Sequence, residues 1–202
     1  MKTLTELGIE YKTDKATDHH FTDVYEQYFS ELRDKKLNIF EIGVLEGASV
    51  RMLRDYFFSS DIYAIDYEDK KHLSGERIFI EKGNQTDIKF MTNVFLGKQF
   101  DIIIDDGGHS MEQQQISIEA MFSRLKSKGI YIIEDLHTSY RYGYSKSHNN
   151  TTLRLIENIS NNTPCTDKFY IKNINKITSL INSCKVYYNN NRTSITSIII
   201  KK

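Results

Sequence analysis

The chain has 202 residues, and its 27 lysines and arginines balance its 27 aspartates and glutamates, so the formal net charge is zero. That balance argues against a dedicated nucleic-acid binder, which normally carries a basic excess. No segment approaches the ~20 apolar residues that a membrane helix needs, and the first residues lack the apolar block of a secretion signal. Cys165 and Cys184 have no metal-binding spacing and indicate reduced thiols in a cytoplasmic protein, with a single disulfide as the alternative.

Seven apolar segments bounded by turn residues predict β-strands. They lie at residues 37–44, 61–66, 77–83, 100–106, 129–135, 184–189 and 194–202. Apolar residues at helical spacing predict helices at 46–57, 86–95, 111–126 and 151–160. Gly129 stands where the helix at 111–126 should stop.

Strands that alternate with helices predict βαβ units. We therefore expect an α/β fold with a mostly parallel, doubly wound, seven-stranded sheet and helices on both faces. The turn sequence "NNNR" between the last two strands predicts a C-terminal antiparallel hairpin. No linker is visible, so we expect a single domain over 1–202, with an N-terminal helical segment at 1–36 and the α/β core at 37–202.

Acidic residues end two of the predicted strands. "FDIIIDDGGHS" places Asp105 and Asp106 at a strand end, and "GIYIIEDLHTSY" does the same for Glu134 and Asp135. Because carboxylates repel one another, a hard divalent cation held by Asp106, Glu134 and Asp135 explains the pattern. Glu134 and Asp135 can share a cation only where the strand ends, because consecutive strand residues point to opposite faces. The alternative is that these acids are helix caps or salt-bridge partners.

A glycine loop follows the first strand. "FEIGVLEGAS" contains Gly43, which allows a tight turn, and Gly47, which allows close approach to a ligand. Asp66 ends the next strand, where a carboxylate can accept hydrogen bonds from both hydroxyls of a ribose. The loop has neither the GxGxxG pattern of dinucleotide sites nor a P-loop lysine. A simple turn, and a helix cap or surface acid at Asp66, are the alternatives.

These motifs together resemble a known family. "EIGVLEGAS", "YAIDY", "GNQTD", "IIIDDGGHS" and "IYIIEDLHTSY" are similar to segments of class I S-adenosylmethionine-dependent methyltransferases, which have a Rossmann-like fold. More narrowly, they resemble the metal-dependent sugar O-methyltransferases of macrolide and related glycoside pathways, as does the N-terminal "EYKTDKATDHHFTDVYEQYF". The chain departs from the commonest pattern at Leu45, where a glycine often stands.

The resemblance implies a role for each candidate residue. The cofactor S-adenosylmethionine would be bound by Glu41, Gly43, Gly47, Asp66, Gln85, Asp87 and Asp105, with Asp66 on the ribose and Gln85 and Asp87 near the adenine. A divalent metal, Mg²⁺ by expectation, would be held by Asp106, Glu134 and Asp135, and His109 would be the general base. His137, Tyr140 and His20 would face the substrate, and Thr13 and Lys15 would close over the cofactor or substrate as part of a lid at 1–36.

The predicted function is methylation of a sugar hydroxyl of a glycoside or polysaccharide precursor, in a homo-oligomer without nucleic-acid or membrane partners. A catechol-like phenolic acceptor, a nicotinamide-dependent oxidoreductase and a non-catalytic protein of the same fold are the alternatives. His137 is the alternative base, and His109 could be an ordinary loop histidine. Asp87 could simply cap a helix. The sequence leaves the acceptor, the choice of metal and the oligomeric state open, and specificity should lie in residues 1–36 and 141–150.

Overall fold

The structure is a computed structural model that describes residues 1–145, 147, 149–189 and 193–202. Among these residues, seven strands form one sheet in the order β3-β2-β1-β4-β5-β7-β6. The strands are β1 (Asn38–Ile42), β2 (Asp61–Asp66), β3 (Ile78–Lys82), β4 (Phe100–Asp105), β5 (Leu125–Ile133), β6 (Ile181–Tyr188) and β7 (Ile195–Lys201). Strands β1 to β5 pair in parallel, and β7 runs antiparallel to both β5 and β6. The predicted fold class and the C-terminal hairpin are confirmed, while most of the predicted turn, at residues 190–192, lies outside the described residues.

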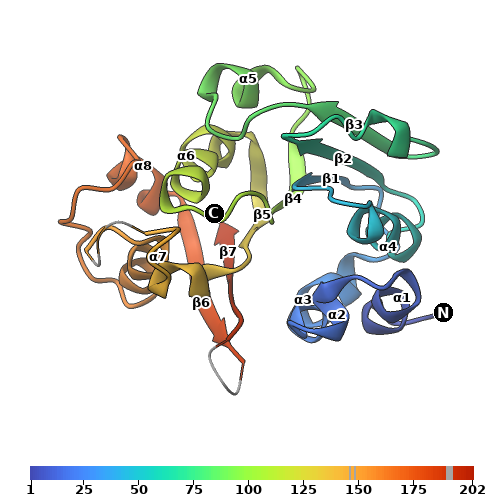
Figure 1. Cartoon of the computed structure of the whole chain (residues 1–202), viewed down its shortest axis with the longest axis horizontal. Helices are drawn as coiled ribbons and strands as arrows, with labels where there is room; N and C mark the ends of the chain where they lie inside the picture. The colour runs from blue at the N-terminus through green and yellow to red at the C-terminus, as the bar shows by residue number, and fades with distance from the viewer. Residues whose placement is uncertain (146, 148, 190–192) are drawn as a thin grey trace.

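Helices cover both faces of the sheet (Figure 1). The helices are α1 (Leu4–Tyr11), α2 (Asp14–Thr17), α3 (Phe21–Phe29), α4 (Ala48–Tyr56), α5 (Ile88–Asn93), α6 (Met111–Met121), α7 (Thr152–Ser160) and α8 (Ile174–Ser179). Short 3-10 turns are η1 (Ser30–Leu32), η2 (Lys71–Leu73), η3 (Phe122–Arg124) and η4 (Leu136–Tyr140). Apolar residues of α1, α3 and α4 pack on one face of the sheet, and those of α5 to α8 pack on the other.

Strand alternation produces this division of the core. In β1, Ile39 belongs to the core under α1, α3 and α4, whereas Phe40 and Ile42 belong to the core under α5 to α8. Parallel strands with both faces buried are nearly continuous apolar runs, as the sequences of β1, β2 and β4 show. The sheet therefore leaves its carboxyl-terminal edge as the place where polar side chains gather.

The predicted helix at 111–126 is too long. Helix α6 ends at Met121, and β5 already begins at Leu125, so Gly129 lies within the strand instead of ending the helix. Leu125 fits the helical spacing in the sequence, yet it is buried as a strand residue that pairs with Phe100 before the register shifts. The short helix α8 was not predicted, while α7 lies within its predicted range and is capped by Thr151.

Across the described part of the chain, no helix is long and apolar enough to cross a membrane. Cys165 and Cys184 are free thiols.

Candidate active site

A cavity of about 540 Å³ lies at the carboxyl-terminal edge of the parallel strands. Loops after β1 to β4 form most of its wall, and residues 12–14 at the start of α2 close one side. Of the predicted site residues, it is lined by Gly43, Asp66, Gln85, Asp106, His109 and Asp135. A crevice at this edge is the usual ligand site of an open α/β sheet.

The glycine loop between β1 and α4 forms the floor of this cavity. Gly43 has a φ of +92°, and a Cβ atom there would lie 2.1 Å from the carbonyl oxygen of Asp106, so only glycine fits. The Asp66 carboxylate accepts hydrogen bonds from the backbone N–H groups of Val44 (2.8 Å) and Leu45 (3.1 Å). Leu45 has a φ of +51°, which explains why a glycine often stands at this position in the family that the chain resembles. Asp66 therefore fixes the loop while still facing the cavity.

Gln85 joins the loop after β3 to the loop after β4. Its amide nitrogen donates to Asp105 (3.2 Å) and Ser117 (3.0 Å), and its oxygen accepts from the N–H of Gly108 (2.7 Å). Asp105 is buried behind Gln85 and outside the cavity wall, and burial raises its pKa to about 7. Asp87 is the N-cap of α5, and its carboxylate accepts a hydrogen bond from the N–H of Phe90 (3.0 Å). This is the helix-capping role that the sequence offers as the alternative to cofactor binding. Asp105 thus supports the wall from behind, whereas Asp87 is an exposed helix cap.

Strand parity places three acids on one face. Ile42, Asp105 and Ile133 lie side by side in register, so Glu41, Asp106 and Glu134, each one residue away, project to the opposite face. Figure 1 shows α2 on that side of the sheet.

The Lys15 side chain from α2 enters this acidic group, as the salt-bridge alternative for Asp106 and Glu134 describes. The sequence predicts a metal ion at these two acids and the cofactor at Glu41. The Lys15 Nζ lies 2.9 Å from Glu134 Oε2 and 3.5 Å from Glu41 Oε1, and it also contacts Asp106 Oδ2. Lys15 is only 1% exposed. Burial disfavours its charged form, but the three carboxylates outweigh that penalty and raise the Lys15 pKa well above its usual value. Burial raises the pKa of Glu41 to about 7, although Lys15 opposes that shift.

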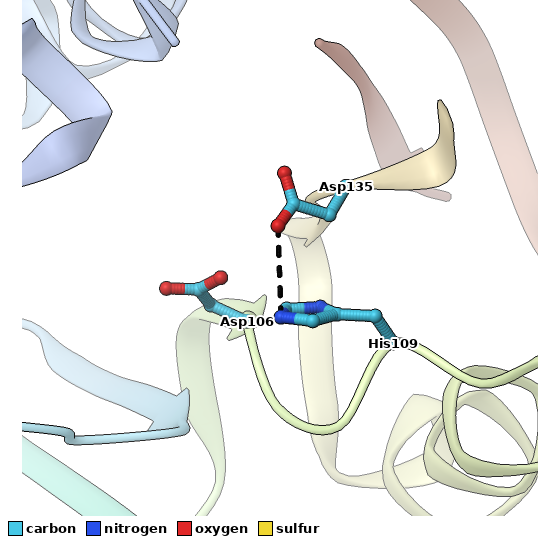
Figure 2. A group of neighbouring side chains, drawn as sticks. All are labelled: Asp106, His109 and Asp135. Atoms are coloured by element: carbon cyan, nitrogen blue, oxygen red, sulfur yellow. Dashed lines mark ion pairs between the residues drawn. The ribbon is translucent and has the colours of Figure 1, made fainter. Parts of the chain in front are cut away.

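Asp106, His109 and Asp135 form a second group that faces the cavity (Figure 2). One oxygen or nitrogen atom from each lies within 4.8 Å of the others, and His109 Nε2 is 3.5 Å from Asp135 Oδ2. Glu134 lies beneath, because its two oxygens accept hydrogen bonds from Tyr25 (2.7 Å) and Lys15. His109 and Asp135 both have a φ near +55°, a conformation that costs about 1 kcal/mol or more per residue and is concentrated at functional sites.

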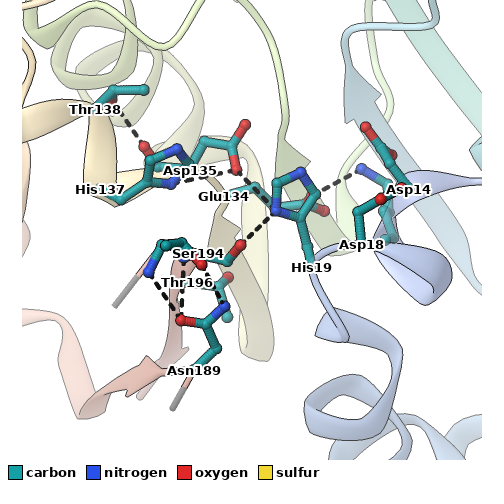
Figure 3. A network of polar contacts seen from close by, with 12 residues as sticks. Asp14, Asp18, His19, Glu134, Asp135, His137, Thr138, Asn189, Ser194 and Thr196 are labelled. Atoms are coloured by element: carbon teal, nitrogen blue, oxygen red, sulfur yellow. Dashed lines mark hydrogen bonds and ion pairs between the residues drawn. The ribbon is translucent and has the colours of Figure 1, made fainter. Parts of the chain in front are cut away.

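Two further histidines face Asp135 (Figure 3). His137 Nδ1 lies 3.7 Å and His19 Nδ1 lies 4.0 Å from Asp135 Oδ1, and the two rings stack with centroids 6.2 Å apart. Burial lowers the pKa of His137. His19 also bonds Ser194 Oγ at 2.5 Å, which connects the N-terminal helices to the start of β7.

The prediction that His20 faces the substrate needs correction, because its neighbour His19, rather than His20, lies beside Asp135. His20 is the exposed N-cap residue of α3, and both histidines line a separate cavity of about 430 Å³ between α3 and the β6–β7 hairpin. The "DHH" pair in the N-terminal motif signalled a histidine near the site but could not say which of the two turns inward. Tyr140 lies at the end of η4, 61% exposed and outside the cavity wall. Glu41 and Gly47 adjoin the cavity without lining it.

No family model matches the chain. The chain is 37% identical over 150 residues to a demethylmacrocin O-methyltransferase from Streptomyces fradiae, a match that covers 70% of this chain and 38% of that protein. It is 32% identical over 170 residues to an 8-demethyl-8-(2-methoxy-alpha-L-rhamnosyl)-tetracenomycin-C 3'-O-methyltransferase from Streptomyces olivaceus, covering 77% and 44%. The chain spans less than half the length of these curated relatives.

Solved structures of methyltransferases also match the chain. The MycE methyltransferase from the mycinamycin biosynthetic pathway, in complex with Mg and S-adenosylhomocysteine, matches 99% of this chain and 53% of its own with a TM-score of 0.84 and 28% identity. A putative caffeoyl-CoA O-methyltransferase from Staphylococcus aureus shares the fold at a TM-score of 0.58 and 16% identity. The sheet order, the cavity and these likenesses define a class I S-adenosylmethionine-dependent methyltransferase. Within that class, the curated relatives that the chain resembles are sugar O-methyltransferases of macrolide and related polyketide pathways.

Proposed function

We propose that this chain transfers a methyl group from S-adenosylmethionine to a sugar hydroxyl of a glycoside, with the help of a divalent cation. One observation carries the proposal: the cavity at the strand ends contains, on one wall, the carboxylates of Asp106 and Asp135 together with His109. A site for a charged small molecule thus adjoins a site that can hold a cation and move a proton.

The cavity suits the cofactor. Its volume lies within the range of small-molecule sites, ~300–1,000 Å³. Asp66 would bind the ribose, since a carboxylate can accept further hydrogen bonds beside those from the glycine loop. Gly43 would lie against the methionine part, and Gln85 would approach the adenine. Glu41 and Asp105, both buried, would act by holding Ser49 and Gln85 in place rather than by touching the cofactor.

The donor set suits a hard divalent cation. Asp106 and Asp135 offer carboxylate oxygens to the cavity, and Oδ1 of Asp135 has no hydrogen-bond partner among the described residues. Glu134 would complete the oxygen set from beneath, while its hydrogen bonds to Lys15 and Tyr25 orient it. When bound, such a cation lowers the pKa of an acceptor hydroxyl, and S-adenosylmethionine supplies the electrophilic methyl group.

His109 would accept the proton of that hydroxyl. Its Nε2 faces Asp135 from the cavity wall, and an imidazole is the side chain whose charge changes near neutral pH. His137 is less suited, because it is buried and lies behind Asp135. The acceptor would approach beside His19, at the end of the cavity that Asp135 lines.

Calorimetric titration with S-adenosylhomocysteine, with Mg²⁺ and with EDTA, is the first test. We expect tight binding in both conditions and methyl transfer to glycosides only with Mg²⁺. Absence of binding in both would refute the proposal. Binding without turnover on any glycoside or catechol would instead indicate a non-catalytic protein of this fold, and turnover on catechols alone would assign a phenolic acceptor.

A further inference from the structure

Lys15 occupies an unusual place for a lysine. It lies on the four-residue helix α2, and its side chain is almost fully buried beneath the strand ends. Helix α2 is packed tightly against α1: a Cβ atom on Gly8 would lie 2.5 Å from the Cβ of Ala16, and the Thr13 N–H donates to the Gly8 carbonyl at 3.0 Å. This packing leaves the ammonium little freedom to move away.

The net charge of the proposed cation site together with Lys15 can be counted from its charged groups. Asp106, Glu134 and Asp135 contribute three negative charges, and Lys15 contributes one positive charge. The remaining two negative charges match a divalent cation. Glu41 is not counted with these groups, because it lies outside the cavity wall, where it contacts Lys15 (3.5 Å) and accepts a hydrogen bond from Ser49.

The contacts of Lys15 also orient two of these carboxylates. Its ammonium holds Glu134 and Asp106 from the buried side, and the Tyr25 hydroxyl holds the other oxygen of Glu134. Both carboxylates are therefore oriented before any cation arrives. The ammonium lines neither the cavity at the strand ends nor the cavity between α3 and the β6–β7 hairpin, so its ion pairs among the described residues are those with the acids.

We propose that Lys15 is a positioning residue of the cation site, which orients Asp106 and Glu134 from within and matches the site's net charge to a divalent ion. The inference rests on the cation site of the proposed function. A purely structural lysine and a charge-matching lysine differ in one measurable respect. Loss of structure lowers the affinity for every cation by a similar factor. Loss of one positive charge raises the affinity for a trivalent ion more than that for a divalent ion, because Coulomb energy scales with ionic charge.

The experiment measures Ca²⁺ affinity by calorimetry and Tb³⁺ affinity by luminescence, in the whole chain without cofactor. We expect Lys15→Met to raise the ratio of Tb³⁺ to Ca²⁺ affinity by roughly tenfold or more. Lys126→Met is the matched control, because Lys126 pairs with Asp101 (2.8 Å) near the opposite end of the sheet, and its ratio should equal that of the unmodified protein.

A second variant covers the case in which Lys15→Met does not fold. Glu134→Gln removes one negative charge and keeps Lys15, so the ratio should fall by a similar factor, and Lys15→Met with Glu134→Gln should restore it. An unchanged ratio in Lys15→Met or in Glu134→Gln, whatever the loss of affinity, would overturn the role of Lys15 alone. An unmodified protein that binds neither ion would overturn it together with the cation site.

Discussion

The close contact between Gly43 and Asp106 gives a quantitative test of how the two halves of the site are joined. The Gly43 N–H donates to the Ile65 carbonyl and the Asp106 N–H donates to the Ile42 carbonyl, each at 2.9 Å, so both loops are held by the sheet. In Gly43→Ala, the new Cβ would lie 2.1 Å from the Asp106 carbonyl oxygen. Neither loop can retreat without losing one of these hydrogen bonds.

The expected cost has two parts. A left-handed φ costs alanine about 1 kcal/mol relative to glycine. Relief of a clash against backbone atoms costs a further ~1–3 kcal/mol, as overpacking does in cores. We therefore expect Gly43→Ala to lower the free energy of unfolding by about 3 kcal/mol, measured by urea denaturation with far-ultraviolet circular dichroism because the chain has no tryptophan. Binding of S-adenosylhomocysteine should weaken in parallel, since the same loop forms the cavity floor.

Substitutions at two other glycines measure the backbone cost and the clash cost separately. Gly97 has a φ of +81° and nothing within 4 Å of a built Cβ, so Gly97→Ala should cost only the backbone term of about 1 kcal/mol. Gly75 has neither feature, and Gly75→Ala should change stability by less than about 0.5 kcal/mol. If Gly43→Ala cost no more than Gly97→Ala, the close approach of Asp106 to the glycine loop would be refuted.

Three further predictions follow from the site and its surroundings. His109→Ala should reduce kcat by about 100-fold or more and leave the dissociation constant of S-adenosylhomocysteine nearly unchanged; a near-normal kcat would transfer the proton step to another group. Ser110→Ala should lower the free energy of unfolding by about 1 kcal/mol, because Ser110 caps α6 directly after the site loop; no change in the denaturation midpoint would contradict that capping role. Burial raises the pKa of Cys184 to about 12, so its thiolate is scarce at neutral pH, and Cys184→Ser should remove less of the rapid reaction with a disulfide reagent than Cys165→Ser; the reverse order would contradict the burial of Cys184.

The sequence could predict most of the fold because the signals are local. Apolar runs mark the strands, and the glycines and acids that end them mark the functional edge. The sequence therefore predicts that Gly43, Asp66, Asp106 and Asp135 gather at the carboxyl ends of the parallel strands, where the cavity lies. The end of α6 could not be predicted in this way. Leu125 keeps the helical spacing of the preceding turns, and only its pairing with Phe100 shows that it starts a strand.

Contacts between distant segments could not be predicted from one sequence. Lys15 meets Asp106 across 91 positions and Glu134 across 119 positions, and His19 meets Ser194 across 175 positions. No local pattern identifies a lysine that will be buried, since lysine is among the residues least often found inside a protein. The N-terminal motif identified the segment, but the packing of α2 on α1 decided which of its side chains turns inward.

The four acids at the strand ends are not one cluster, and strand geometry explains why. Asp105 and Asp106 are neighbours in the chain, but they point to opposite faces, so Asp105 holds Gln85 behind the cavity wall while Asp106 faces Lys15 and the cavity. Glu134 keeps the side-chain alternation of β5 and points to the face where Lys15 lies. The left-handed backbone conformation of Asp135 turns its side chain toward His109 and the cavity. Each aspartate or glutamate pair thus divides into one residue that faces the cavity and one that supports the site from behind. A substitution of Asp105 should therefore first disturb the loop that Gln85 holds, whereas a substitution of Asp106 should first lower the affinity for the cation.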